Sequence, residues 1–223
     1  MVVGLQTGST SHQDVYQISL ERPDSVRKVG STPTWVDQGA AACVMGDTLY
    51  AVGLGHGCNE LWKWNEASDW LRCADMTSCR YAHSVAVVDS TLYTLGGWTN
   101  VDGIALSSVE AYNTQTNKWS AAGQLTHAVR SAACVTYKNV IYMMGGVQGP
   151  DTEVAHVQMY SPAQHSCTLM PRAMPRAMGY MRAVLWETSA ILIDRYTCFI
   201  YLRAPAESIQ RRVNDCHAVS ASA

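Results

Sequence analysis

Ser84–Trp119 is the stretch that decides the fold, and it reads SVAVVDSTLYTLGGWTNVDGIALSSVEAYNTQTNKW. Two apolar runs rich in β-branched residues flank Asp89-Ser90, and the second run ends at Gly96-Gly97. A polar loop, a third apolar run, the turn Asn113–Asn117 and Lys118-Trp119 follow. Because β-branched and aromatic residues favour a pleated surface whereas Gly, Asn and Asp mark bends, the stretch predicts four short antiparallel strands in one sheet.

The same unit recurs along the chain at a nearly constant period. The glycine that ends the second predicted strand recurs at intervals of 49, 43 and 49 residues, at Gly4, Gly53, Gly96 and Gly145. The residue that ends the third strand recurs at intervals of 46, 48 and 48 residues, at Ile18, Trp64, Tyr112 and Tyr160. Two positions that keep one period predict a repeat architecture. Aromatic pairs, Trp64 with Trp70 and Tyr112 with Trp119, are expected to face each other across antiparallel strands.

The double glycine followed by Tyr112 and Trp119, at a period near the roughly 50 residues of kelch repeats, resembles the kelch β-propeller. Within that family the chain is most similar to the propeller part of the kelch-like proteins. Val87–Gly97 is a close match to the family pattern, and Val135–Gly146 is nearly as close. The chain departs from the pattern at Gly4-Leu5, Gly53-Leu54, Cys167 and Asp194-Arg195. The resemblance covers about residues 2–193 and implies an all-β fold, a kelch-type β-propeller.

The repeat count predicts an incomplete propeller of about three full four-stranded blades with a partial blade at each end. The expected blades are residues 1–38 (partial), 39–78, 79–127, 128–176 and 177–193 (partial), followed by an irregular tail over 194–223 that could hold a further strand at Phe199–Leu202 and a short helix at Pro205–Val213. The repeat pattern deteriorates from Pro171, where residues 171–178 are a short tandem duplication, PRAMPRAM. Since kelch-like propellers usually have six blades, we expect an open arc with an exposed edge, and the chain could be a fragment or an altered product of a longer protein.

Composition bounds the class of protein. The 223 residues carry a net charge of −2 and are 48% hydrophobic, which is ordinary globular composition without the basic excess of a nucleic-acid-binding protein. No apolar run approaches the ~18 residues of a membrane helix, and the first residues lack the basic start and apolar run of a signal peptide. These features predict a cytoplasmic protein that binds neither nucleic acid nor membrane.

Eight cysteines test that prediction. No C-x-x-C occurs, and the spacing from Cys73 to Cys79 does not suit a zinc knuckle. We expect reduced, structural thiols, because disulfides are rare in the cytosol, with a reactive or redox-sensing cysteine as the alternative. No metal and no cofactor is predicted.

One glycine-rich stretch, Gly53–Asn59, has the form G-x-G-x-G. A phosphate-binding loop of that form must open into a helix, whereas Glu60–Trp64 is strand-like. The stretch is therefore expected to be a surface loop, and its His56 and Asn59 are candidates for contact with a partner.

Two longer loops, Trp98–Ser107 and Val147–Ala155, occupy the equivalent place in the next two repeats. Loops on a rigid scaffold are where binding function concentrates. Trp98 is either a partly exposed binding residue or a residue that packs on the neighbouring blade. Arg80 and His83 could face a ligand, although hydrogen bonds to neighbouring backbone are favoured for both. The candidate partner-binding residues are His56, Asn59, Arg80, His83, Trp98, Asn100, Arg130, Gln148 and Asp151.

No catalytic pattern is present. The chain has neither G-x-S-x-G nor H-E-x-x-H, and its histidines lack ligand spacing. Galactose oxidase, a copper enzyme, shares the kelch fold, but the sequence does not suggest its constellation, and no enzyme is predicted. Resemblance to kelch-like proteins implies a protein-interaction module that captures a client for a cullin-based ubiquitin ligase, the cullin being engaged through BTB and BACK domains that these residues do not include. The alternative is a kelch protein that binds actin.

Overall fold

The computed structural model describes residues 14–18, 26–34, 39–55, 58–99, 103–193 and 198–201. Contacts divide the chain into two units, unit 1 (residues 1–79) and unit 2 (residues 80–223), and each is described by itself. The described residues are nearly all in strands, and the one helical element among them is a short 3-10 turn, η1 (Pro162–Gln164). The predicted all-β class is confirmed.

Unit 1 holds two antiparallel sheets. The first pairs β1 (Asp14–Ile18) with β2 (Val26–Ser31). The second has the order β3-β4-β5-β6, with β3 (Ala41–Met45), β4 (Thr48–Leu54), β5 (Glu60–Asn65) and β6 (Ser68–Arg72). Val15 of the first sheet packs against Leu49 and Trp64 of the second, so that apolar side chains join the two sheets.

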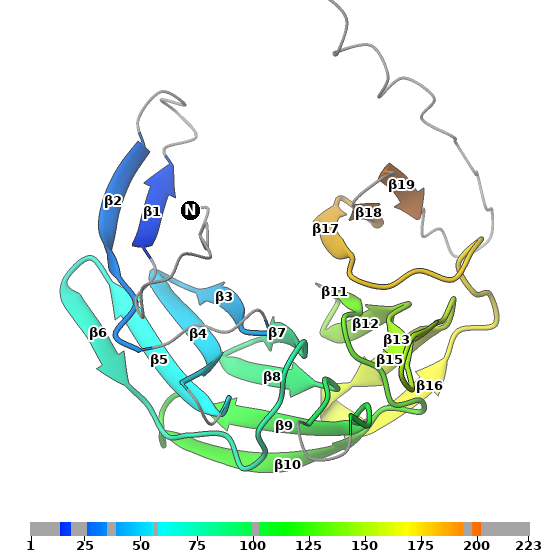
Figure 1. Cartoon of the computed structure of the whole chain (residues 1–223), viewed down its shortest axis with the longest axis horizontal. Coiled ribbons are helices and arrows are strands. Elements are labelled where there is room, and N and C mark those ends of the chain that lie inside the picture. The colour runs from blue at the N-terminus through cyan, green and yellow to red at the C-terminus, as the bar shows by residue number, and fades with distance from the viewer. Residues whose placement is uncertain are drawn as a thin grey trace, which may run out of the picture. The chain divides into compact units, whose positions relative to one another are not determined.

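Unit 2 holds two four-stranded sheets whose strands follow one another in chain order (Figure 1). The first contains β7 (Ser84–Val88), β8 (Thr91–Leu95), β9 (Ser108–Asn113) and β10 (Lys118–Gln124). The second contains β11 (Ala133–Tyr137), β12 (Val140–Met144), β15 (Val157–Ser161) and β16 (Ser166–Leu169). The predicted strands of Ser84–Trp119 are therefore present, in the expected order.

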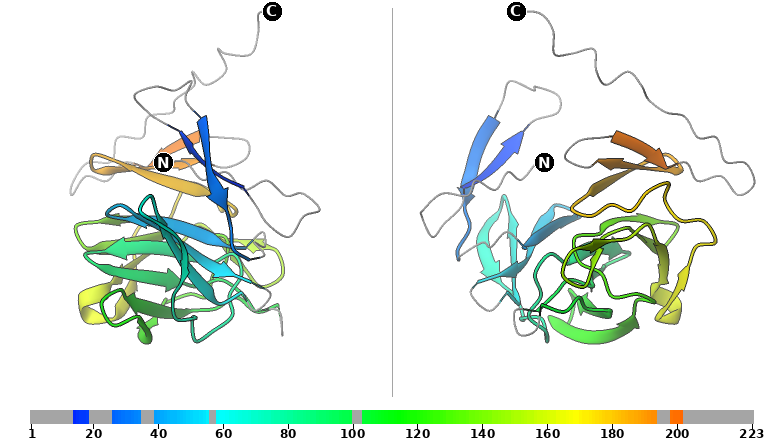
Figure 2. Two further views of the ribbon diagram at one scale, coloured as in Figure 1. Left: turned by 90° about the vertical axis from the view of Figure 1, so that its left-hand side faces the viewer. Right: turned by 45° about the vertical axis from the view of Figure 1, so that its right-hand side comes forward.

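Two smaller sheets complete unit 2. A hairpin of β13 (Val147–Gln148) and β14 (Thr152–Glu153) lies within the loop that follows β12. A three-stranded sheet contains β17 (Arg182–Trp186), β18 (Ser189–Ile193) and β19 (Cys198–Tyr201). This three-stranded sheet lies beside the sheet that contains β11, since β17 contacts β11 (Figure 2). Because β11 also contacts β7, the sheet of β11 lies between the other two. The pairing of β18 with β19 carries this sheet past Ile193 and includes most of the further strand that was considered for Phe199–Leu202.

The sheets of unit 2 stack face to face, which explains the composition of their second strands. Tyr142, Met143 and Met144 of β12 are all buried, although neighbouring residues of a strand point to opposite faces, because Met143 packs in the cluster with the preceding sheet and Tyr142 and Met144 pack in the cluster with the following one. A strand can bury both faces only when a layer covers each of them. The continuous apolar run of such a second strand therefore reflects its position between two layers.

The double glycines leave room for the linker that leads to the next sheet. Gly96 has a φ of 63°, and a Cβ there would overlap the carbonyl oxygen of Val129. Gly145 repeats this geometry, with a φ of 61° and the carbonyl oxygen of Met178 in the same place. Glycine is needed at both positions, because other residues are strained at positive φ and lack the room. The repeat period thus reflects a packing requirement between neighbouring sheets.

The aromatic pair at the outer edge is confirmed in unit 2. Tyr112 lies opposite Trp119 in the β9–β10 register, with ring centroids 5.2 Å apart. In unit 1 the β5–β6 register shifts between Lys63 and Asn65, so strict opposite pairing is lost, yet Trp64 and Trp70 share one hydrophobic cluster. Of the other sequence predictions, Gly4 and the helix at 205–213 lie outside the described residues. The open arc and the blade boundaries stay predictions.

Candidate functional site

Two loops of unit 2 form the candidate site, the one after β8 and the one after β12. Short bridges hold them: Trp98 pairs with Tyr81 and Ala105, and Arg130 pairs with Val147. The backbone N–H of Trp98 donates to the Tyr81 carbonyl at 3.0 Å, and that of Tyr81 donates to the Trp98 carbonyl at 2.9 Å. The loop bases are therefore fixed by backbone hydrogen bonds to the linkers between sheets.

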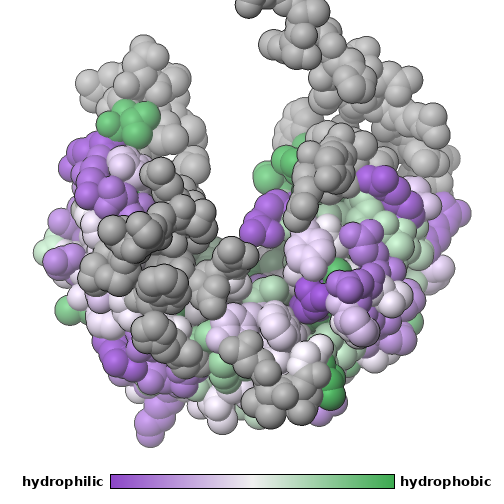
Figure 3. All heavy atoms as spheres, in the orientation of Figure 1, coloured by the Kyte–Doolittle hydropathy of each residue, from purple (hydrophilic) through white to green (hydrophobic). Residues whose placement is uncertain are grey.

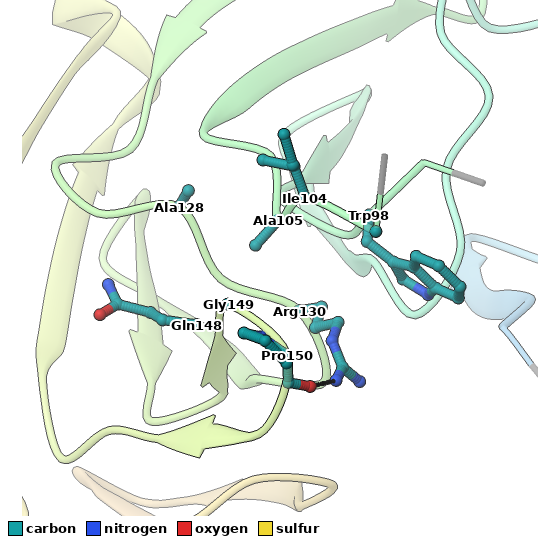
Figure 4. Close-up of a pocket in the computed structure, with 9 residues that line it drawn as sticks. Trp98, Ile104, Ala105, Ala128, Arg130, Gln148, Gly149 and Pro150 are labelled. Atoms are coloured by element: carbon teal, nitrogen blue, oxygen red, sulfur yellow. Dashed lines mark hydrogen bonds between the residues drawn. The ribbon is translucent and has the colours of Figure 1, made fainter. Parts of the chain in front are cut away.

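A pocket of about 640 Å³ opens between these loops. Figure 4 shows Trp98 and Ile104 coming from one loop and Arg130, Gln148 and Pro150 from the opposite side, around an open space. Ile104 is 61% exposed and Trp98 is partly buried. The pocket thus combines an apolar wall with one guanidinium, which is the composition of sites that accept side chains of a partner.

Arg130 is held rigidly at the edge of this pocket. Its guanidinium lies 5.9 Å from the ring centroid of Trp98 and 5.8 Å from that of Tyr180. It donates to the Tyr180 hydroxyl at 2.9 Å and to the Pro150 carbonyl at 2.6 Å, the second bond being drawn in Figure 4. The carboxylate of Asp151 lies 3.8 Å away, on a side chain that is 92% exposed. Stacking and hydrogen bonds preorganise this cation for a planar polar partner.

Trp98 is partly packed and partly at the pocket, and its role in binding stays a prediction. Its ring lies 5.6 Å from that of Tyr81, at the linker that precedes β7, so part of the indole is packed within unit 2. The rest lines the pocket beside Arg130. A partly packed indole that still offers surface is the usual state of an aromatic anchor at an interface.

The prediction that Arg80 contacts a partner is wrong. Its side chain is 0% exposed, and it donates to the carbonyl oxygens of Gly96 and Ser108, each at 2.9 Å. It also donates to the Glu110 carboxylate at 2.7 Å. Backbone hydrogen bonding, the favoured alternative for this residue, describes its environment. Arg80 is a structural cation that ties the linker to β9.

His83 is also interior, so it too is unavailable to a partner. It is 6% exposed, and its Nδ1 lies 3.2 Å from the Arg80 carbonyl oxygen, to which it can donate. Burial lowers the pKa of His83 to about 4, and the nearby Arg80 cation acts in the same direction. The ring is neutral in the folded protein at pH 7.

The pKa of His83 predicts acid sensitivity of unit 2. The unfolded chain takes up a proton near pH 6.5, whereas the folded chain does so only near pH 4, so stability falls as the pH decreases between these values. We expect the free energy of unfolding to fall by about 2 kcal/mol from pH 7 to pH 5 through this residue. Urea unfolding at both pH values measures it. His83→Gln should flatten the profile, and an unaltered profile in His83→Gln would refute the assignment.

The other predicted residues fall in different places. Gln148 lines the pocket and Asp151 lies at its rim beside Arg130, so Trp98, Arg130, Gln148 and Asp151 are brought together. Asn59 belongs to unit 1, where its amide contacts the Met76 carbonyl oxygen at 3.4 Å. His56 and Asn100 lie outside the described residues.

The sequence did not indicate several residues of the site, among them Ile104, Pro150 and Tyr180. Ile104 and Pro150 lie in loops chosen as candidates, but nothing in their type marks them as lining residues. Tyr180 follows a segment in which the repeat pattern deteriorates. The backbone conformation shows that Tyr180 occupies a repeated position. Ala82, Ser131 and Tyr180 all have positive φ (50°, 54° and 56°) at intervals of 49 residues. The N–H of Ser131 donates to the Ala82 carbonyl, and that of Tyr180 to the Ser131 carbonyl, so the linkers repeat even where the sequence does not.

Six cysteines are free thiols: Cys43, Cys58, Cys73, Cys79, Cys134 and Cys167. Burial raises the pKa of Cys134 to about 11, and its thiol lies 3.1 Å from the Val85 carbonyl oxygen. A buried thiol with a raised pKa is a poor nucleophile. Among the described residues no group of three His, Cys, Asp or Glu side chains could hold a metal ion. None of the described helical segments has the length and apolar character needed to cross a membrane.

Stacked four-stranded antiparallel sheets, joined by linkers that recur every 49 residues, define a β-propeller repeat. Residues 79–126 match the family model described as the kelch motif. The fold is that of a kelch-type β-propeller, and the repeats are similar to those of the kelch-like proteins.

Curated relatives agree. The chain is 25% identical to Kelch-like protein 35 of Mus musculus over 86% of this chain and 34% of that protein. It is 28% identical to Kelch repeat and BTB domain-containing protein 4 of Homo sapiens over 86% of this chain and 37% of that protein. Among solved structures, "Structure of YjhT" matches with a TM-score of 0.60 and 17% identity, over 70% of this chain and 57% of that one, a likeness of fold alone. The chain spans about a third of the length of the curated relatives it matches.

Proposed function

We propose that this chain is a non-catalytic protein-interaction module that binds a segment of a client protein at the pocket of unit 2. The observation that carries the proposal is the preformed pocket, in which the exposed Ile104, the half-packed Trp98 and the fixed Arg130 converge. The apolar wall and the oriented cation can together hold one apolar and one polar group of a peptide. This arrangement suits binding rather than catalysis.

The finer proposal is that the captured protein is a substrate of a cullin-RING ubiquitin ligase. Its support is the likeness to kelch-like proteins and to a relative whose name includes a BTB domain. These 223 residues would supply recognition, and recruitment of the cullin would need BTB and BACK domains. Cytoplasmic location belongs to the same proposal and rests on the sequence features given above.

Trp98→Ala is expected to lower the affinity for a bound peptide by roughly thirtyfold or more, since aromatic anchors contribute about 2 kcal/mol or more. A displayed random-peptide library selected on the native chain supplies the probe, and fluorescence polarisation of the enriched peptide measures the dissociation constant. Arg130→Lys, which keeps the charge but loses the planar fork, should weaken binding by a smaller factor. Leu169→Ala, on the exposed outer strand β16, is the matched control.

The outcomes test the location of the binding site, the ubiquitin-ligase role and the actin-binding alternative separately. Enriched peptides that bind Trp98→Ala as tightly as the native chain would place the site elsewhere. If the client carrying the enriched motif accumulates in cells when this chain is expressed, the ligase assignment is supported, because the chain shields the client without recruiting a ligase. Co-sedimentation with filamentous actin, unaffected by Trp98→Ala, would favour the cytoskeletal alternative instead.

A further inference from the structure

Charge is unevenly placed around the pocket of unit 2. Of the described residues that line the pocket, Arg130 alone is charged. Within the described part of the chain, the carboxylate in ion-pair range of its guanidinium belongs to Asp151, between β13 and β14. Figure 3 shows hydrophilic side chains gathered over the β13–β14 hairpin, in the orientation of Figure 1. An apolar wall therefore meets a single cation, and one carboxylate stands beside that cation.

The hydrogen bonds of Arg130 leave part of its guanidinium for a ligand. An arginine side chain has five N–H donors in one plane. Among the described residues, two neutral groups accept from it, the Tyr180 hydroxyl at 2.9 Å and the Pro150 carbonyl at 2.6 Å. The Asp151 carboxylate lies 3.8 Å from Nη2, which suits an ion pair but is too long for a hydrogen bond. The described contacts therefore use fewer donors than the guanidinium offers.

Covering Arg130 with a client makes a charged partner necessary. The side chain is only 14% exposed, and a charge that loses its remaining water is costly unless an opposite charge pairs with it. Either Asp151 moves in to pair with the guanidinium, or the client supplies the carboxylate. The hairpin favours the second arrangement, because it presents the Pro150 carbonyl to Nη2 and leaves the Asp151 side chain 92% exposed.

We infer that a carboxylate of the client binds Arg130 beside an apolar side chain on Trp98 and Ile104, and that Asp151 competes for the same cation. The inference rests on the proposed function, since it names the chemistry of the group that the same pocket binds. A carboxylate matches the planar fork through two parallel hydrogen bonds. A phosphate dianion matches it less well, because the pocket offers one cation and Asp151 repels the added charge. The carboxylate belongs either to an Asp or Glu side chain or to the C-terminus of the client.

Asp151→Asn tests the competition. The probe is a library-selected peptide that loses affinity for Trp98→Ala, and fluorescence polarisation measures its dissociation constant. Asp151→Asn should tighten binding about two- to fivefold, the range set by a solvent-exposed ion pair. Glu153→Gln is the matched control and should leave the affinity unchanged. It removes the same charge from the same hairpin, and Glu153, also exposed, is not paired with Arg130 within the described residues. Weaker binding in Asp151→Asn would make Asp151 the partner of Arg130 and overturn the inference, as would unchanged binding.

Changes in the probe peptide locate the carboxylate. Each Asp or Glu is replaced by Asn or Gln, and the peptide is made with a free or an amidated C-terminus. One of these changes should weaken binding about tenfold or more, because a hydrogen bond to a charged group contributes that much. The same change should have little effect on binding to Arg130→Gln, whose folding is checked by urea unfolding.

The failures of the two proposals are distinguishable. A peptide that depends on Trp98, yet keeps its affinity through every loss of a carboxylate, overturns this inference and leaves the proposed function in place. A carboxylate effect that persists in Arg130→Gln also overturns it, since the anion then binds elsewhere. Peptides that bind Trp98→Ala as tightly as the native chain, or a selection that enriches none, overturn the proposed function and this inference with it.

Discussion

Arg80→Met is expected to lower the free energy of unfolding of unit 2 by about 3–5 kcal/mol, because it removes the partner of a buried carboxylate. Glu110 is 4% exposed and lies 2.7 Å from the guanidinium of Arg80. The substitution also strips hydrogen bonds from the carbonyl oxygens of Gly96 and Ser108, which lie at the loop base below the pocket. Denaturant unfolding followed by tryptophan fluorescence measures the effect.

A double variant separates the stability lost through the broken ion pair from the stability lost through the other contacts of Arg80. Arg80→Met combined with Glu110→Leu leaves no uncompensated charge, so it should be more stable than Arg80→Met alone. If the two single variants and the double variant are simply additive, the buried pair is not what holds this linker. Arg27, exposed in an ion pair with Glu66, provides the contrast: Arg27→Met should change stability by less than about 1 kcal/mol.

Gly96→Ala is expected to destabilise unit 2 by about 3 kcal/mol or more. Two costs combine: an L-residue at a φ of 63° carries about 1–2 kcal/mol of strain, and the added Cβ would overlap the carbonyl oxygen of Val129. That oxygen cannot move freely, since it accepts the N–H of Gly97 at 2.9 Å. Thermal or urea unfolding of the variant measures the loss.

Gly103→Ala is the matched control for this prediction. Gly103 has the same φ of 63°, but nothing lies within 4 Å of the position of an added Cβ. It should therefore lose only about 1–2 kcal/mol, the cost of the backbone conformation. Equal losses for the two variants would show that the approach of the next linker does not matter. The peptide-binding assay is not the readout here, because Gly103 lines the pocket.

The strands were predictable because their signals are local. The runs Val85–Val88 and Thr91–Leu95, with turn residues between and after them, became β7 and β8 of one sheet. The tandem segment 171–178 shows where local reading fails. Pattern alone indicates a decayed repeat, yet Met174 and Met178 are both buried in the cluster between the last two sheets. The linker keeps its register there, because Met174 and Met178 lie 49 residues after Leu125 and Val129, which are buried in the preceding cluster.

The two arginines among the predicted site residues show a different limit. Arg80 and Arg130 are 50 residues apart, whereas the linkers repeat every 49, so Arg130 occupies the place of Tyr81 rather than that of Arg80. A shift of one residue sends one guanidinium to the interior and the other to the pocket. Sequence reasoning treated both as candidates, because residue type is identical and the exact repeat register appears only in the hydrogen bonds between linkers.

The amino-acid sequence by itself determined the all-β repeat, since alternation, turn residues and glycine spacing act over a few neighbouring residues. Tertiary structure alone decided which side chains face a partner. Burial depends on the sheet packed alongside, 49 residues away in the chain: Val135 is covered and Val184 is exposed, although both occupy one position of the repeat. The physical reason is that the residues of a strand determine whether it forms, whereas the burial of its side chains depends on a sheet from another part of the chain.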